Sequence, residues 1–182
     1  MSTALGLVEF KTVPIGIYAA DEMIKAAAIK LLFASPSCPG KYIIIVSGEV
    51  GNVETSVKRG LEAGGSFYID SCVIPNISET VIPALTGTIH VPDIKAIGVI
   101  ETIAAVSAIM VGDIVAKAAE VSLLEIRLAR GLGGKGEIFY TGELGAVEAA
   151  NKAALDAAGK EGIIVSSVVI ARPAPALIEA IA

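Results

Sequence analysis

Aromatic side chains are scarce in this chain of 182 residues: they make up 4% of it, and tryptophan is absent. The mean hydropathy is nevertheless +0.73 and rests largely on alanine, isoleucine and valine. A chain of this length has room for one ordinary domain or for two small ones. Two small cores cannot bury so much apolar surface, so we expect the excess in large subunit interfaces.

Long hydrophobic runs are also missing. The longest apolar stretch beside a predicted helix, residues 102–112, is closed by Glu101 and Asp113. A membrane-spanning helix needs about 20 predominantly apolar residues. The first four residues carry no basic side chain and begin no signal-peptide core. We therefore expect a cytosolic location and no membrane partner.

Charge of one sign is not concentrated in either half of the chain. The formal net charge is −5; residues 1–91 carry 6 basic and 8 acidic side chains, and residues 92–182 carry 8 and 11. Because no basic stripe is present to neutralise phosphates, nucleic-acid binding is not expected.

Histidine and cysteine are too few for most catalytic sites. His90, the only histidine, lies in a predicted linker, which excludes a Ser-His-Asp triad and a histidine-rich zinc site within one chain. We therefore expect no enzyme. Cys72 lies in an apolar strand, where an inert thiol is typical. Cys38 lies in a loop, and in a symmetric oligomer one such cysteine per subunit converges on the axis, where three thiolates can hold three corners of an iron–sulfur cube.

What the sequence does contain is an internal repeat. Residues 4–32 match residues 96–124 without a gap, with 10 identities in 29 positions, and residues 47–63 match 141–157 with 8 in 17. The offset grows from 92 to 94 and then to 96, which indicates small insertions in the second copy. The repeat predicts two tandem domains, residues 1–86 and 96–182, joined by a linker at 87–95.

Each copy has the same expected order of elements, β-α-β-β-α-β-α. In the first copy we predict strands at 4–11, 29–34, 42–46 and 67–75, helices at 15–28, 48–64 and 78–85, and a loop at 36–40. Residues 42–46 are aromatic or β-branched throughout, which favours a central strand. The expected fold is α+β and ferredoxin-like: a mainly antiparallel sheet covered by helices on one face.

The glycine-rich segment 130–136 has the composition of a phosphate-binding loop but not its pattern. That pattern requires glycine five residues before the Gly-Lys pair and serine or threonine after it. Ala129 and Gly136 occupy these positions. We interpret the segment as a hairpin turn, in which glycine also allows backbones to approach closely around a symmetry axis.

Several segments, in this order and twice over, resemble the bacterial microcompartment shell domain. They are residues 4–9 and 96–101, 21–27 and 113–119, 48–51 and 142–145, and 170–173. Within this family the chain is similar to the tandem-domain members of propanediol-utilisation compartments. The segments that carry this closer similarity are residues 38–41, 69–71, 81–85 and 131–135.

The resemblance implies a homotrimer that mimics a hexamer, tiles with other shell proteins and lies in the microcompartment shell of a bacterial cytoplasm. It also implies one [4Fe-4S] cluster per trimer, ligated in the central pore by Cys38 of three subunits, for electron transfer across the shell or for delivery to encapsulated redox enzymes. The pore lining implied by the resemblance comprises Ser37, Pro39, Gly40, Leu132, Gly133 and Gly134.

The same resemblance assigns contacts at the edge of the tile to Lys25, Lys117 and Arg172. Asn76 and Ile77 stand where the first copy would carry the Arg-Pro pair of the family, which weakens this assignment for the first copy.

Two alternatives remain open at this point. The chain is a shell tile whose pore gates metabolites and holds no cluster, or it is a soluble ligand-binding regulator on a ferredoxin-like fold, since a fold alone does not settle function. Iron content distinguishes the first alternative, and self-assembly into sheets or tubes distinguishes the second.

Overall fold

A computed structural model describes residues 3–87, 94–128 and 131–181. The chain divides into two compact units: Met1–Ile77 with Ala129–Gly134, and Ser78–Leu128 with Lys135–Ala182. Most of the predicted linker, His90 included, lies outside the described residues. The predicted domain boundaries follow the sequence repeat, whereas the compact units follow packing.

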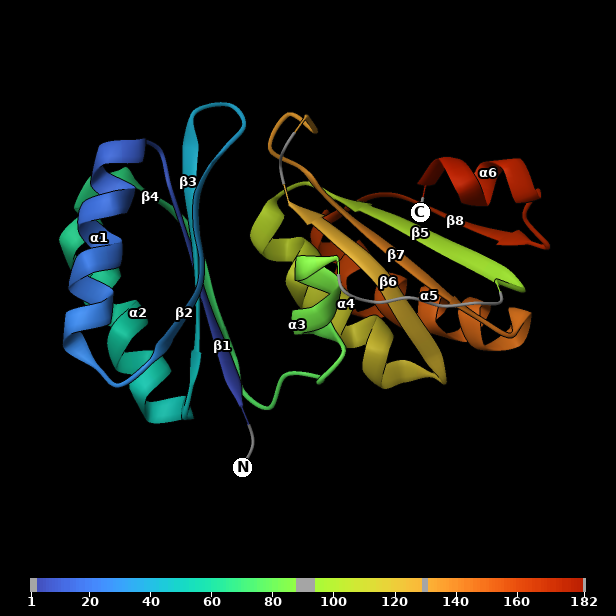
Figure 1. Cartoon of the computed structure of the whole chain (residues 1–182), viewed down its shortest axis with the longest axis horizontal. Coiled ribbons are helices and arrows are strands. Elements are labelled where there is room, and N and C mark those ends of the chain that lie inside the picture. The colour runs from blue at the N-terminus through green and yellow to red at the C-terminus, as the bar shows by residue number, and fades with distance from the viewer. Residues whose placement is uncertain (1–2, 88–93, 129–130, 182) are drawn as a thin grey trace. The chain divides into compact units, whose positions relative to one another are not determined.

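The first unit is a four-stranded antiparallel sheet with two helices on one face (Figure 1). The strand order is β2-β3-β1-β4. Its strands are β1 (Ala4–Phe10), β2 (Lys30–Ser37), β3 (Lys41–Gly48) and β4 (Tyr68–Ile74), and its helices are α1 (Val13–Ala26), α2 (Val50–Gly64) and the short 3₁₀ turn η1 (Gly65–Phe67).

The second unit repeats this architecture, with the strand order β6-β7-β5-β8. Its strands are β5 (Ala96–Thr102), β6 (Val121–Leu128), β7 (Gly136–Gly142) and β8 (Ile164–Ala171). Its helices are α4 (Ala105–Ala118), α5 (Leu144–Ala158), the 3₁₀ turn η2 (Gly159–Glu161) and α6 (Pro175–Ile181). The unit also includes α3 (Val81–Thr86), the last helix of the first sequence copy, which packs against β6 and α4.

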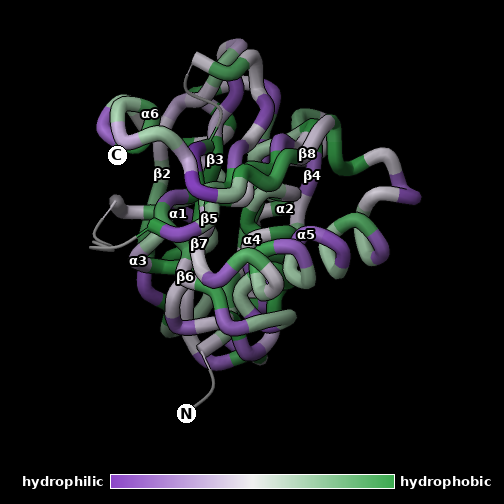
Figure 2. The backbone as a smooth tube through the Cα atoms, turned by 90° about the vertical axis from the view of Figure 1, so that its right-hand side faces the viewer, coloured by the Kyte–Doolittle hydropathy of each residue, from purple (hydrophilic) through white to green (hydrophobic). Residues whose placement is uncertain are grey.

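Local sequence explains most of these elements. Buried residues Tyr42–Val46 lie in β3, an inner strand, as their apolar run predicts. Helix α2 ends at Gly64; the capping residue Gly65 donates its N–H to the Leu61 carbonyl and has φ of +50°, a conformation that favours glycine. Helix α5 alternates hydrophilic and hydrophobic segments along the chain (Figure 2), as expected for a helix with one face on a sheet.

The predicted loop at residues 36–40 is wrong by two residues, because β2 continues through Pro36 and Ser37. Pro36 pairs with Tyr42, and Ser37 pairs with Lys41. Strand β2 is at the edge of its sheet, where a proline without an N–H is tolerated. The turn is thereby reduced to residues 38–40.

No helix among the described residues is long and apolar enough to cross a membrane.

Candidate functional site

The turn between β2 and β3 carries Cys38 at its tip. The Gly40 N–H donates to the Ser37 carbonyl at 2.9 Å and closes the turn, with a cis peptide bond between Cys38 and Pro39. Gly40 has φ of +82°, which favours glycine at this position. Cys38 is a free, half-buried thiol, while Pro39 and Gly40 are exposed. The sequence therefore places one thiol per chain in an accessible turn.

Ser37, the residue before this cysteine, has a buried hydroxyl without a hydrogen-bond partner within the described residues. A buried hydroxyl normally has a partner, because leaving it unpaired costs about 1–3 kcal/mol. The unpaired hydroxyl marks the base of the Cys38 turn as a place where a further polar group fits.

The glycine-rich turn of the second copy contributes a neighbour to the first unit. A Cβ atom on Gly134 would lie 3.1 Å from the Cys38 carbonyl oxygen and 3.6 Å from the Pro39 Cδ. Gly134 also has φ of +93°. Both the space and the backbone conformation favour glycine here, so Gly134 lies against the backbone of the Cys38 turn. The pore lining expected from these residues requires the oligomer and stays a prediction.

Each sequence copy has an equivalent lysine–glutamate pair at the start of its inner strand, β3 or β7. Lys41 Nζ lies 3.1 Å from Glu9 Oε1, and Lys135 Nζ lies 2.9 Å from Glu101 Oε1. Glu9 is fully buried, and its burial raises the pKa of the carboxyl, although Lys41 acts in the opposite direction. Sequence reasoning missed both pairs; the signal was the identity of both partners in the two copies.

The predicted edge residues lie at the ends of helices and strands. Lys25 binds Asp21 at 2.5 Å in the last turns of α1, and Lys117 binds Asp113 at 2.6 Å in α4. Arg172 is exposed after β8, and its N–H donates to the Lys95 carbonyl at 2.9 Å. The edge contacts themselves require neighbouring tiles and stay a prediction.

Asn76 and Arg172 occupy equivalent positions in the two copies and share a left-handed backbone, with φ of 57° and 49°. Asparagine enters this conformation more readily than other side chains. The departure from the family pattern at Asn76 therefore preserves the backbone while it removes the charge.

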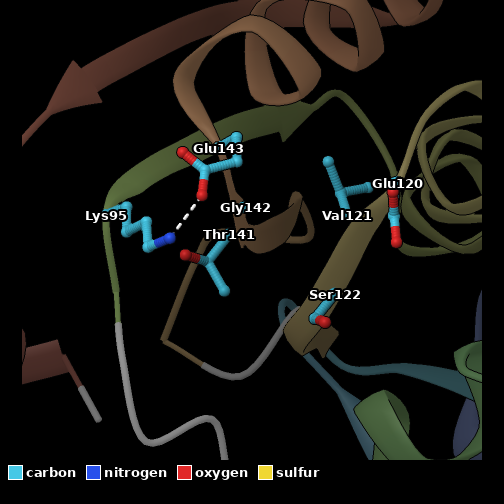
Figure 3. A pocket seen from close by; sticks show the side chains of 7 residues that line it. All are labelled: Lys95, Glu120, Val121, Ser122, Thr141, Gly142 and Glu143. Atoms are coloured by element: carbon cyan, nitrogen blue, oxygen red, sulfur yellow. Dashed lines mark hydrogen bonds and ion pairs between the residues drawn. The ribbon is translucent and has the colours of Figure 1, made fainter.

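A shallow pocket of about 240 Å³ lies at the other end of the second sheet, away from the β6–β7 turn. Its lining includes the Lys95–Glu143 ion pair, which Figure 3 shows pointing across the opening. The Thr141 hydroxyl beside it donates to the Ala96 carbonyl at 2.6 Å. The ion pair and the Thr141 hydroxyl thus already have partners within the chain.

The second cysteine, Cys72, lies in β4 and is half-buried. Burial, with a smaller contribution from Asp70, raises the pKa of its thiol. Within the described residues no three histidine, cysteine or acidic side chains cluster as metal ligands.

Comparison with known proteins identifies the repeated unit. The BMC domain family matches twice, at residues 4–77 and 96–173. The microcompartment shell protein PduT of Citrobacter freundii is 35% identical over 173 residues, which cover 95% of this chain and 94% of that protein. Carboxysome shell protein CcmK2 of Synechocystis sp. is 40% identical over 63 residues, covering 35% of this chain and 61% of that protein.

Solved structures agree with the architecture of both units. A microcompartment protein from Desulfitobacterium hafniense superposes with a TM-score of 0.94 at 38% identity, covering 98% of this chain and 99% of that one. A fused, permuted hexameric shell protein matches with a TM-score of 0.64 at 21% identity over 87% and 84% of the two chains, which shows the fold alone. The chain therefore belongs to the BMC domain family and is a structural microcompartment shell protein with two tandem BMC domains.

Proposed function

We propose that this chain assembles as a trimer of pseudohexameric shape and tiles with other shell proteins into the microcompartment wall. The tandem domains support this proposal, because three chains supply six copies of one fold. The apolar composition supports it as well, since a trimer buries surface that the single chain exposes. Expressed alone at high concentration, the protein is expected to form sheets or tubes under the electron microscope, and a small discrete oligomer would instead favour the regulator alternative.

The finer proposal is that Cys38 from three subunits holds a [4Fe-4S] cluster in the central pore. Its main support is the placement of Cys38: a free, half-buried thiol at the tip of a turn, with Gly134 packed on its backbone. Cysteine thiolates are the usual ligands of such clusters. The second copy carries Leu132 at the position equivalent to Cys38, so three subunits offer three thiolates.

The residues around Cys38 fit this role. The unpaired Ser37 hydroxyl lies beside the ligand position and can donate to a sulfur atom. Lys41 is held by Glu9 and adds a positive charge near the turn. When bound, the cluster would supply one-electron redox chemistry at the pore, and the Cys38 turn would hold the thiolate ligand in place.

The test is the iron and acid-labile sulfide content of anaerobically purified or reconstituted protein. We expect about four iron atoms per three chains in the wild type, none in Cys38→Ser, and an unchanged content in Cys72→Ser. Light scattering of all three proteins separates loss of the cluster from loss of the trimer. Assembled protein without iron leaves a shell tile whose pore gates metabolites.

A further inference from the structure

The cysteine-bearing copy surrounds its lysine–glutamate pair differently from the other copy. Glu9 is fully buried, and apart from Lys41 neither of its carboxylate oxygens has a partner among the described residues. The repeat equivalent of Glu9, Glu101, keeps 25% of its side chain exposed. Because a buried carboxylate has little water to stabilise its charge, its protonation responds strongly to any other charge nearby.

Strand register places two further polar residues of the first copy beside this pair. Asp70 of β4 is paired directly with Glu9 of β1, and Ser37 of β2 is paired directly with Lys41 of β3. Directly paired residues present their side chains to the same face of a sheet. The second copy has serine and glycine at the positions equivalent to Asp70 and Ser37. The additional acid and the buried, unpaired hydroxyl therefore belong to the copy that carries the cysteine.

Lys41 connects this group of side chains to the cysteine turn. It is the first residue of β3 and follows the turn at 38–40 directly. A Cβ atom on Gly134 would lie 3.6 Å from Lys41 Nζ and 3.1 Å from the Cys38 carbonyl oxygen, so the ammonium lies close to the backbone of the turn. Charges so near to one another interact strongly where water is scarce. Negative charge added at Cys38 therefore acts on the Lys41–Glu9 pair.

We infer that Glu9 takes up a proton when an electron enters the pore site, so that the proton compensates the added charge. The inference rests on the proposed [4Fe-4S] cluster and specifies the residue that answers its reduction. An external one-electron donor is oxidised and the cluster is reduced by one electron. The proton comes from solvent past the partly exposed Lys41; one O–H bond forms on the carboxylate, and no bond in the protein breaks.

Two charged groups face Glu9 from the neighbouring strands. Burial raises the pKa of Glu9, Lys41 opposes this rise, and Asp70 adds to it. The turn at 131–134, which belongs to the same unit, carries only glycine and leucine. Electron entry adds negative charge and raises the pKa of Glu9 further. Between the pKa values of the oxidised and the reduced protein, the midpoint potential is expected to fall as the pH rises, by up to about 59 mV per pH unit for one proton per electron.

Spectroelectrochemical titration of the reconstituted protein at a series of pH values tests this inference. Wild type is expected to show the falling potential, and Glu9→Gln a potential that does not depend on pH. Asp70→Asn keeps the proton acceptor and is expected to move the sloping window to lower pH, because a charge that raises the pKa of Glu9 is gone. The matched control is Glu101→Gln, the same change in the other copy, which is expected to keep both slope and window.

Infrared difference spectra of wild type, reduced minus oxidised, supply a readout that needs no variant. A band of a protonated carboxylic acid is expected to appear on reduction and to shift in deuterated water. A wild type without iron overturns the proposed cluster, and this inference with it. An iron-bearing wild type with a potential independent of pH, or without the carboxylic acid band, overturns only the role of Glu9. A slope that persists in Glu9→Gln, or a window that stays in place in Asp70→Asn, also overturns that role.

Discussion

The two units fold alike but divide their interior volume differently between helix and sheet. In the first unit, Gly16 of α1 leaves room for Tyr42 of β3, since a Cβ on Gly16 would lie 2.4 Å from the Tyr42 Cβ. The second unit has Ala108 in the helix and Gly136 in the strand, and a Cβ on Gly136 would lie 2.4 Å from the Ala108 Cβ. In each unit this helix–strand contact requires one glycine. The glycine is in the helix in the first unit and in the strand in the second unit.

A different substitution occurs where the first strand of each copy, which carries glycine in both units (Gly6 and Gly98), meets its neighbours. In the second unit the Tyr140 ring lies over Gly98, and its hydroxyl donates to Asn151 at 3.1 Å. The equivalent positions of Tyr140 and Asn151 in the first unit are Val46 and Val57. A core accepts such exchanges when the total volume and the polar pairing are kept. The Gly16–Tyr42 and Ala108–Gly136 contacts show that the backbone of this fold does not prescribe which layer carries the larger side chain.

The largest expected effect on stability comes from filling the space that the Tyr140 ring occupies over Gly98 in the second unit. Gly98→Ala places a Cβ 2.1 Å from the Tyr140 ring, and because the buried ring cannot move aside we expect a loss of about 3 kcal/mol in the free energy of unfolding. Denaturant unfolding measures it. The control is Gly145→Ala, where a Cβ meets no atom within 4 Å; equal stability of the two variants would contradict the packing argument.

The second-largest expected effect is a difference in stability between alanine variants of the equivalent aspartates Asp113 and Asp21. Asp113→Ala removes the acceptor of the Ser78 N–H and is expected to cost about 1–3 kcal/mol. Asp21→Ala, at the exposed equivalent position, is expected to change stability by less than about 0.5 kcal/mol in the single chain. Thermal unfolding at a protein concentration at which light scattering shows single chains measures both. Similar losses would mean that the buried and exposed aspartates are energetically equivalent.

A smaller effect on stability is expected when Gly60 and Met23 of the first unit are replaced by the residues at the equivalent positions of the second unit. A Cβ on Gly60 would lie 2.6 Å from the Met23 side chain, and the second unit carries Ala154 and Val115 at these positions. Gly60→Ala and Met23→Val are each expected to destabilise the first unit, and the double variant to recover about 1 kcal/mol of the summed loss. A double-mutant cycle by denaturant unfolding measures the coupling, and strict additivity would show that the two sites are independent.

The smallest effect is a pH dependence at the buried glutamate. Burial raises the pKa of Glu9 in the folded chain despite Lys41, so the folded state binds this proton more tightly than the unfolded state does. Its contribution to stability is therefore complete below the ordinary carboxyl pKa and declines as the pH rises through the raised pKa. Glu9→Gln is expected to remove this decline, so its stability relative to wild type increases across that window.

Unfolding of Glu9→Gln and wild type between about pH 4 and pH 8 tests this expectation. Glu101→Gln, the same change in the other lysine pair, sets the baseline for losing a carboxylate beside a lysine. A stability difference between Glu9→Gln and wild type that does not change with pH would show that the buried carboxyl is not the source.

Local sequence signals predicted the order of elements, the antiparallel sheets and the Cys38 turn, and the structure confirms them. The end of β2 was misjudged, because Pro36 reads as a loop residue unless the strand is known to be at a sheet edge. The Glu9–Lys41 pair was not predicted, since the two residues are 32 positions apart and only strand register brings them together.

The sequence by itself determined the repeat, the fold of each copy and the presence of one loop cysteine, because periodicity, glycine and proline act over a few residues. The tertiary structure decided that α3 belongs to the second unit. It also decided that Asp113 is buried while Asp21 is exposed, and that the Glu9 side chain is fully buried. These outcomes depend on which surfaces meet, and burial is a property of the assembled layers rather than of any one segment.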